Sequence, residues 1–315
     1  MVLAFPDVGS AVDVVLVTDS YYAHDAASQR AVTPIESALQ IGDNIWLGPV
    51  PDELEERICR ACEPPGEAFD PVRQYHFPYA LYKLDSGMGA EEDLSFDSNL
   101  RLQTAIVLSR LVHPTAAGLT HAARLRRTES GEAQIVPKRQ WGIDPGAYVV
   151  RENEDWLVPA DAPQIHELMT AFERAKPPAR VLTALWHLEA AFHTHFIDLR
   201  WPILTTALEA LVRIPDEQHG GRFVGSTKCF VDRMVALGQI ESTLVVSESD
   251  LKAMYSHRSQ YTHGLRPQNL TLTARALYER QEEVCRQIIR RAILDNTFGG
   301  IFATDATIKS AMPLR

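Results

Sequence analysis

The stretch of residues 254–264 holds the side chains best suited to phosphate binding and proton transfer. Its sequence is MYSHRSQYTHG, in which four residues separate Arg258 from His263. Arginine stays charged and presents a planar fork of donors that matches phosphate oxygens. Histidine titrates near neutral pH, so it can take or give a proton there. Because a metal-free ribonuclease needs these two roles, we identify Arg258 and His263 as candidate catalytic residues.

Four neighbours of this pair carry groups that could contact a nucleotide. The Ser259 hydroxyl could touch a phosphate, or it could only cap or solvate the helix. Tyr261 and Thr262 could stack on a base or hydrogen-bond to it. Tyr255 is expected in the core, because it falls on the apolar stripe of its predicted helix. The candidate substrate-binding residues are therefore His257, Ser259, Tyr261 and Thr262.

The spacing of Arg258 and His263 limits what one helix can do alone. With 25 Arg and 11 His in 315 residues, one Arg-x4-His spacing is expected about once by chance. Positions i and i+5 of an ideal helix point about 140° apart. The two side chains converge if the helix ends near His263, which Gly264 and Pro267 permit, or if two chains share one site.

A carboxylate inside a predicted apolar helix gives a second indication of a site. Glu209 lies in the segment WPILTTALEALV, where a charged group is costly unless it is paired. We therefore expect Glu209 to bind a basic group, either Arg233 or Arg258. In the second case, Glu209 would position the arginine of the candidate site.

The residues around the Arg-x4-His pattern resemble the HEPN superfamily, in particular its Apea-like branch. The signature of that family is an arginine, a polar residue, a short spacer and a histidine at the edge of a helix, and residues 251–264 match it. Residues 201–211 and 223–237 resemble the two helices that precede the motif in the family. The resemblance covers residues 165–295.

The resemblance implies a helical bundle that works as a homodimer through the C-terminal half, with two motifs meeting in one composite cleft. It also implies a metal-independent endoribonuclease that leaves a 2′,3′-cyclic phosphate on RNA, in defence or in a toxin–antitoxin system. An antitoxin or another regulatory protein would then be a further partner. Because other members of the family only bind, the alternative is a non-catalytic RNA-binding, nucleotide-binding or interaction protein.

Composition and charge narrow the class of protein. A net charge of −10 in 315 residues counts against a protein that coats nucleic acid. The charge is uneven, because residues 251–291 hold 8 Lys or Arg against 3 Asp or Glu. Four cysteines are too few for a disulfide framework, and no segment resembles a signal peptide or a membrane span. We therefore expect a cytoplasmic protein without membrane association.

Two sets of potential metal ligands are less convincing than the Arg-x4-His pattern. Residues 187–195 include three histidines and Glu189, but their spacing differs from His-Glu-x-x-His. A metal hydrolase built on them is the third hypothesis. Cys59 and Cys62 lack a second pair, so we interpret them as half-buried residues of a helix. We expect no metal and no cofactor.

The hydrophobic pattern predicts an α+β domain over residues 1–158, followed by an all-α, HEPN-like helical bundle over residues 159–315. The role of the first domain is not readable from its sequence. Its strands are expected at residues 12–17, 44–49, 74–83, 133–136 and 147–150, with residues 117–160 otherwise irregular, and its helices at residues 51–62 and 98–112. Pro78 favours an edge or bulged position for the third strand. The bundle helices are expected at residues 161–176, 179–196, 199–212, 223–237, 248–263 and 272–294.

Overall fold

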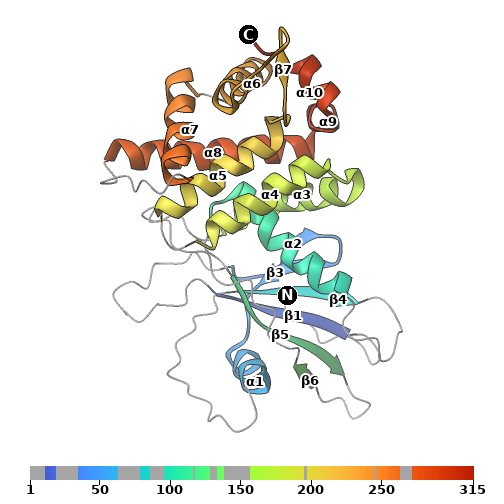
Figure 1. Cartoon of the computed structure of the whole chain (residues 1–315). Helices are drawn as coiled ribbons and strands as arrows, with labels where there is room; N and C mark the ends of the chain where they lie inside the picture. Colours follow the sequence, from blue (N-terminus) through green and yellow to red (C-terminus); the bar gives the residue numbers. More distant parts are fainter. Residues whose placement is uncertain are drawn as a thin grey trace. The chain divides into compact units, whose positions relative to one another are not determined.

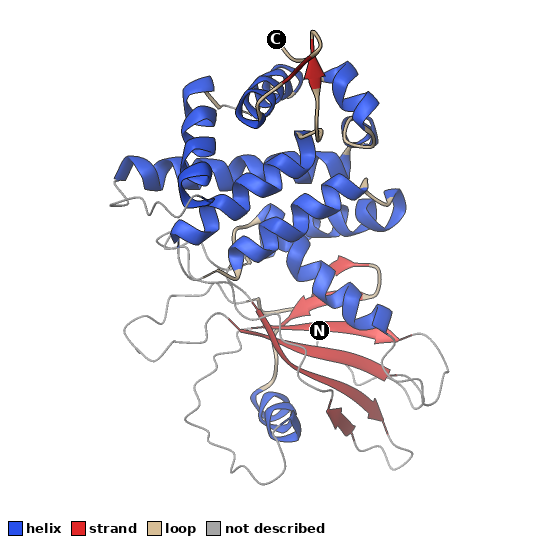
Figure 2. Cartoon of the chain, viewed as in Figure 1, coloured by secondary structure: helices blue, strands red, loops and turns tan. Residues whose placement is uncertain are grey.

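The computed structural model shows two compact units, Met1–Thr170 and Ala171–Arg315 (Figure 1). It describes residues 11–18, 35–62, 79–85, 96–115, 118–127, 133–137, 157–194, 197–244, 246–262 and 272–315. The expected change from an α+β region to a helical region is confirmed, as Figure 2 shows by secondary structure. The predicted domain boundary at residue 158 stays a prediction.

The first unit is built on a six-stranded antiparallel sheet with the strand order β2-β3-β4-β1-β5-β6. Its strands are β1 (Ala11–Thr18), β2 (Leu39–Gly42), β3 (Ile45–Gly48), β4 (Tyr79–Asp85), β5 (Gly118–Arg127) and β6 (Ala133–Pro137). Its helices are α1 (Asp52–Cys62) and α2 (Phe96–Val112), and a short 3₁₀ helix at Pro159–Asp161 precedes α3 (Ala162–Ala175).

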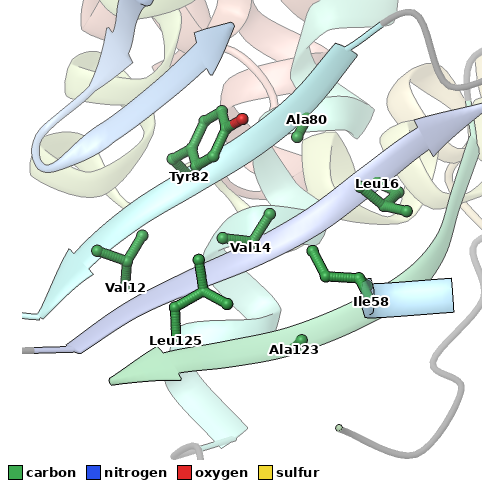
Figure 3. Packing of buried hydrophobic residues seen from close by; sticks show 8 residues of the cluster. All are labelled: Val12, Val14, Leu16, Ile58, Ala80, Tyr82, Ala123 and Leu125. Atoms are coloured by element: carbon green, nitrogen blue, oxygen red, sulfur yellow. The ribbon is translucent and has the colours of Figure 1, made fainter. Parts of the chain in front are cut away.

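Alternating residues of β1 point to opposite faces of the sheet. Val12, Val14 and Leu16 lie on the face that packs against Ile58 of α1 (Figure 3). Asp13 lies on the other face, where its two carboxylate oxygens accept hydrogen bonds from Arg124 Nε at 2.8 Å and Nη2 at 3.1 Å. Both side chains are buried, so this ion pair joins β1 to β5 inside the sheet.

Two expectations for the sheet are wrong. The irregular structure expected for residues 118–127 is wrong, because these residues form β5, which lies inside the sheet between β1 and β6. The strand after Pro78 was expected at an edge or a bulge, yet β4 lies between β3 and β1 in regular register. β4 spans Tyr79–Asp85, and Pro78 itself lies outside the described residues. Residues 147–150 lie outside the described part of the chain.

The second unit contains the helices that follow α3. They are α4 (Ala179–Phe192), α5 (Ile197–Val212), α6 (Ser226–Ile240), α7 (Glu248–Thr262), α8 (Leu272–Leu294), α9 (Asn296–Gly300) and α10 (Asp305–Ala311). The six expected bundle helices, counted from α3 to α8, are confirmed with small shifts of their ends, whereas α9 and α10 were not expected. The second unit also departs from the all-α expectation by a two-stranded hairpin, β7 (Gln218–His219) and β8 (Arg222–Phe223). The positive φ angles of Gly220 and Gly221, 60° and 77°, suit its tight turn.

Helix α5 is the central element of the second unit. It packs against α4, α6, α7 and α8, and its apolar residues Leu204, Ala207, Leu208 and Leu211 are fully buried. Within the described residues, no helix has the length and the apolar character that crossing a membrane requires.

Candidate functional site

The residues of the Arg-x4-His motif belong to α7, whose start is well defined. The Asp250 backbone N–H donates to Ser247 Oγ at 3.0 Å, and Glu248 and Asp250 complement the positive end of the helix dipole. Leu251, Met254 and Tyr255 are buried at the spacing expected for one helix face. Because α7 contacts α5, α6 and α8, its position in the bundle is determined by packing on several sides.

Glu209 of α5 binds the arginine of the motif. Its Oε2 lies 3.3 Å from Arg258 Nη2, and its Oε1 accepts a hydrogen bond from the Tyr255 hydroxyl at 3.0 Å. Arg213 Nη1 lies 3.9 Å from the same Oε1. The Glu209 side chain is 5% exposed and that of Arg258 is 26% exposed. The expected pairing of Glu209 with a basic group is confirmed, and its partner is Arg258.

Arg233, the other expected partner of Glu209, binds a different carboxylate. Its Nη2 lies 2.5 Å from Glu217 Oε1, and its Nη1 donates to the Val212 carbonyl oxygen at 2.8 Å. Arg233 is fully buried, and the Glu217 side chain is only 4% exposed. The Arg233–Glu217 pair is therefore closed to solvent, whereas the arginine of the Arg258–Glu209 pair is partly exposed.

Tyr255 supports the Arg258 guanidinium from within the core. The guanidinium carbon lies 5.7 Å from the centre of the Tyr255 ring, and Phe230 packs against that ring at 5.3 Å between centres. Burial, with the nearby Glu209 carboxylate, raises the pKa of Tyr255. The phenol therefore stays protonated and keeps donating to Glu209, and its expected place in the core is confirmed.

His257 contacts α5 at a second place. Its ring stacks on Trp201 with 4.3 Å between centres and 22° between planes, and Trp201 also lies 6.3 Å from the ring of Tyr278 on α8. Trp201 is 3% exposed, whereas His257 is half-buried. Burial lowers the pKa of His257, which favours a neutral imidazole at physiological pH.

The remaining predicted residues are placed only in part. Ser259 and Tyr261 are half-buried residues of α7, and Thr262 is the last residue of that helix. His263 and Gly264 lie outside the described residues, so the convergence of Arg258 with His263 stays a prediction. No role was predicted for Trp201 or Arg213 from the sequence. The i,i+4 spacing of Glu209 and Arg213 was a signal for the second of these.

The basic residues of α8 are largely engaged in pairs along the helix. Arg275 Nε lies 3.1 Å from Glu279 Oε1, and Arg291 Nη2 lies 2.9 Å from Asp295 Oδ2. Such exposed pairs neutralise charge locally and contribute little to stability. The basic excess of this region is therefore weaker than its composition indicates.

Two sets of potential metal ligands were predicted, residues 187–195 on and after α4 and the cysteines of α1. His193 Nε2 lies 2.8 Å from Glu189 Oε1, while His195 lies outside the described residues. Cys59 and Cys62 are half-buried on α1 beside the sheet core, as expected. Within the described part of the chain, no three His, Cys, Asp or Glu side chains come close enough together to hold a metal ion.

No family model, no curated protein and no solved structure matches the chain.

Proposed function

We propose that the second unit is a HEPN-type, metal-independent endoribonuclease. The observation that carries this proposal is the contact of Arg258 with Glu209. A buried carboxylate holds one side of the guanidinium, while the side chain stays 26% exposed at the edge of a helix. An arginine that is partly exposed and oriented in this way loses little freedom when it binds a phosphate.

The proposed reaction uses Arg258 and His263 in different roles. Arg258 binds the non-bridging phosphate oxygens and stabilises the charge that develops on them. His263 moves a proton during attack of the ribose 2′-oxygen on phosphorus. The P–O5′ bond breaks, and the products are a 2′,3′-cyclic phosphate and a 5′-hydroxyl. His257, Ser259, Tyr261 and Thr262 would contact the RNA around the cleaved bond.

The test is an RNA cleavage assay on mixed-sequence RNA with excess chelator. Arg258→Ala and His263→Ala should each reduce cleavage by about 10²–10⁴-fold, the range for loss of one acid–base or phosphate-binding group. Circular dichroism and melting should stay close to wild type, because Glu209 keeps the Tyr255 hydroxyl and Arg213 as partners when Arg258 is removed, and because His263 is expected at a helix edge. Wild-type cleavage by either variant contradicts its assignment. Cleavage that requires added metal would favour the metal hydrolase.

We further propose that two chains form one composite cleft through their C-terminal units. Positions i and i+5 of one helix point about 140° apart, so Arg258 and His263 of one chain face different directions. In a dimer, Arg258 of one chain could meet His263 of the other. The interface would be isologous, with α7 of each chain close to the two-fold axis. The dimer would work in the cytoplasm, with an antitoxin or another regulatory protein as partner.

The composite cleft can be tested by mixing two inactive variants. If each half of the reaction uses residues of both chains, heterodimers of Arg258→Ala with His263→Ala should recover part of the activity, because the shared cleft then keeps one Arg258 and one His263. Mixing each variant with itself is the control. A protein that is monomeric in solution yet fully active would contradict this model.

The second candidate function is a non-catalytic RNA- or nucleotide-binding protein, and one observation favours it. The Glu209 carboxylate orients the Arg258 guanidinium for a phosphate whether or not the bound RNA is then cut. Under this alternative, labelled RNA binds with salt-dependent affinity but is not cut. Arg258→Ala should then weaken RNA binding, and neither the variant nor the wild type should cleave the RNA.

A further inference from the structure

Two arginines lie beside the buried carboxylate of Glu209. Arg258 Nη2, on α7, is 3.3 Å from Oε2, and Arg213 Nη1, just after the end of α5, is 3.9 Å from Oε1. Because both nitrogens approach the oxygens of one carboxylate, the two guanidinium groups are close to each other. The buried Tyr255 donates its hydroxyl to Oε1 at 3.0 Å and so helps to fix the carboxylate.

The backbone of Arg213 is held by two hydrogen bonds. Its N–H donates to the Glu209 carbonyl oxygen at 2.8 Å, and its own carbonyl oxygen accepts from Arg180 Nη1 at 2.7 Å. Arg180 is also bonded to Asp305, which offsets the charge of Arg180. The Arg213 side chain therefore extends from a fixed point of the second unit.

The charges of Glu209, Arg213 and Arg258 do not cancel. Two guanidinium groups and one carboxylate leave a net charge of about +1 at neutral pH. Glu217, four residues after Arg213, is bound to Arg233 instead. Like charges that are held close together repel each other, so an anion bound between the two arginines would stabilise the cluster.

Exposure increases from the carboxylate to the two arginines. The side chains of Glu209, Arg258 and Arg213 are 5%, 26% and 48% exposed. An anion in solvent can therefore reach the guanidinium groups, while Glu209 is shielded. The pair of Arg213 with Glu209 is long and half-exposed, so it is weak and gives way to a stronger acceptor. A phosphate is such an acceptor, because its oxygens match the planar fork of a guanidinium.

We propose that Arg213 is a second phosphate-binding residue, which together with Arg258 holds one phosphodiester group of RNA. The inference deepens the proposed function and rests on it for the choice of RNA as the ligand. A phosphodiester carries one negative charge, which matches the net charge of the three side chains. A terminal phosphate carries close to two negative charges, so the cluster fits an internal phosphate of the strand better than its end.

The test measures binding of the full chain to RNA that cannot be cut by this chemistry. A labelled 2′-O-methyl RNA oligonucleotide of mixed sequence has no 2′-hydroxyl to attack phosphorus, and fluorescence anisotropy gives its affinity at several salt concentrations. Arg213→Ala should weaken binding about 10-fold, as for loss of a hydrogen bond to a charged group. The slope of log K against log salt should fall by about 0.7, the value for one phosphate of a single strand.

The double variant tests whether the two arginines share one phosphate. Arg258→Ala alone should have the same effect on affinity and slope as Arg213→Ala. Because either change already frees the shared phosphate, the double variant should bind about as weakly as the weaker single variant. Losses that multiply, with a slope reduced by about 1.4, would show contacts to two separate phosphates and overturn the shared site.

Arg275 on α8 provides a matched control. Its side chain is 47% exposed and pairs with Glu279 four residues later, but Glu279 is 35% exposed, whereas Glu209 is buried. Arg275→Ala should keep the wild-type affinity and salt slope. Equal effects of Arg213→Ala and Arg275→Ala would show a general effect of positive charge and would overturn the proposal.

Two further variants separate charge from folding. Arg213→Lys keeps the charge and should keep most of the salt slope. Arg213→Gln removes the charge but keeps much of the apolar stem, so it should weaken binding while the melting curve stays close to wild type. Wild-type binding by a folded Arg213→Gln variant would contradict the role of Arg213.

The outcomes separate this inference from the proposed function. If the wild type cleaves RNA and Arg258→Ala does not, but Arg213→Ala binds as the wild type does, the nuclease stands and the role of Arg213 is wrong. If both arginines are needed for binding but the wild type cuts no RNA, the phosphate site stands and the nuclease fails. Binding of inorganic phosphate without binding of the oligonucleotide would assign the arginines to a free phosphate ion and overturn the diester.

Discussion

Each unit of the chain contains a carboxylate bonded to an arginine, and the two pairs differ in exposure. In the sheet, the side chains of Asp13 and Arg124 are 2% and 8% exposed, and the pair is bidentate. In the bundle, Glu209 is 5% exposed while Arg258 is 26% exposed. A pair that is closed to solvent contributes only to folding, whereas a partly exposed arginine can also come into contact with a ligand. A buried carboxylate that holds a partly exposed arginine is therefore a better candidate for a ligand site than a pair that is closed on both sides.

The largest effect expected from this comparison is on the stability of the sheet. Arg124→Ala should lower the free energy of unfolding by about 3–5 kcal/mol, because it leaves the Asp13 carboxylate buried without its partner. Replacing both residues by apolar ones, as in Asp13→Leu with Arg124→Met, should recover much of this loss. Denaturant titration followed by circular dichroism measures both.

The matched control for this prediction is an exposed pair of the same unit. Arg60 Nη2 lies 2.5 Å from Glu56 Oε1 on α1, and the two side chains are 65% and 55% exposed. Arg60→Ala should cost less than about 0.5 kcal/mol, as is usual for such helix pairs. Equal losses for Arg124→Ala and Arg60→Ala would show that burial does not govern the first pair.

A smaller effect, on activity, is expected at the open pair. Glu209→Gln keeps an acceptor for Tyr255 but removes the charge that orients Arg258. We expect RNA cleavage to fall by about 10- to 100-fold, as for a misplaced catalytic group. The double variant with Arg258→Ala should be no worse than Arg258→Ala alone, since Glu209 acts through that arginine.

Glu217→Gln is the control within the bundle. It weakens the closed pair with Arg233, so it should destabilise the unit while the folded fraction keeps full cleavage activity. If Glu217→Gln and Glu209→Gln reduce activity equally, the loss reflects general loosening of the bundle and Glu209 has no positioning role.

Periodicity predicted the bundle well and the sheet less well, for physical reasons. The six expected helices α3–α8 follow from apolar residues at helical spacing and from glycine and proline at their ends. β5 was missed because it is a central strand whose arginine at position 124 is buried by pairing with Asp13. A long-range ion pair between strands 111 positions apart leaves no signal in the local pattern.

In the candidate site, too, the local sequence predicted one contact and missed another that depends on helix packing. The cost of a charge inside an apolar helix predicted that Glu209 needs a basic partner, and Arg258 is that partner. The stack of His257 on Trp201 joins residues 56 positions apart in the sequence, and it depends on how α7 packs against α5. Residue types alone indicated neither the contact nor the burial of His257.

The smallest effect concerns acid, and it compares one histidine from each unit. Burial lowers the pKa of His121 on β5 and of His257 on α7. Both therefore bind a proton less readily in the folded protein than in the unfolded chain, where the pKa is about 6.5. Their contribution to stability is complete above this value and is lost as the pH falls through the folded-state pKa.

Peptide-resolved hydrogen exchange at pH 7 and pH 5 can follow the two units separately, since it reports local opening. Acidification should increase opening of β5 and of α7 in the wild type. His121→Phe should reduce the increase at β5 only, because the replacement ring has no proton to bind. His257→Phe should reduce the increase at α7 only. If either variant changes the acid-induced exchange of the other unit, protonation of each histidine does not act on its own surroundings. The responses of β5 and α7 to acid would then not be independent of each other.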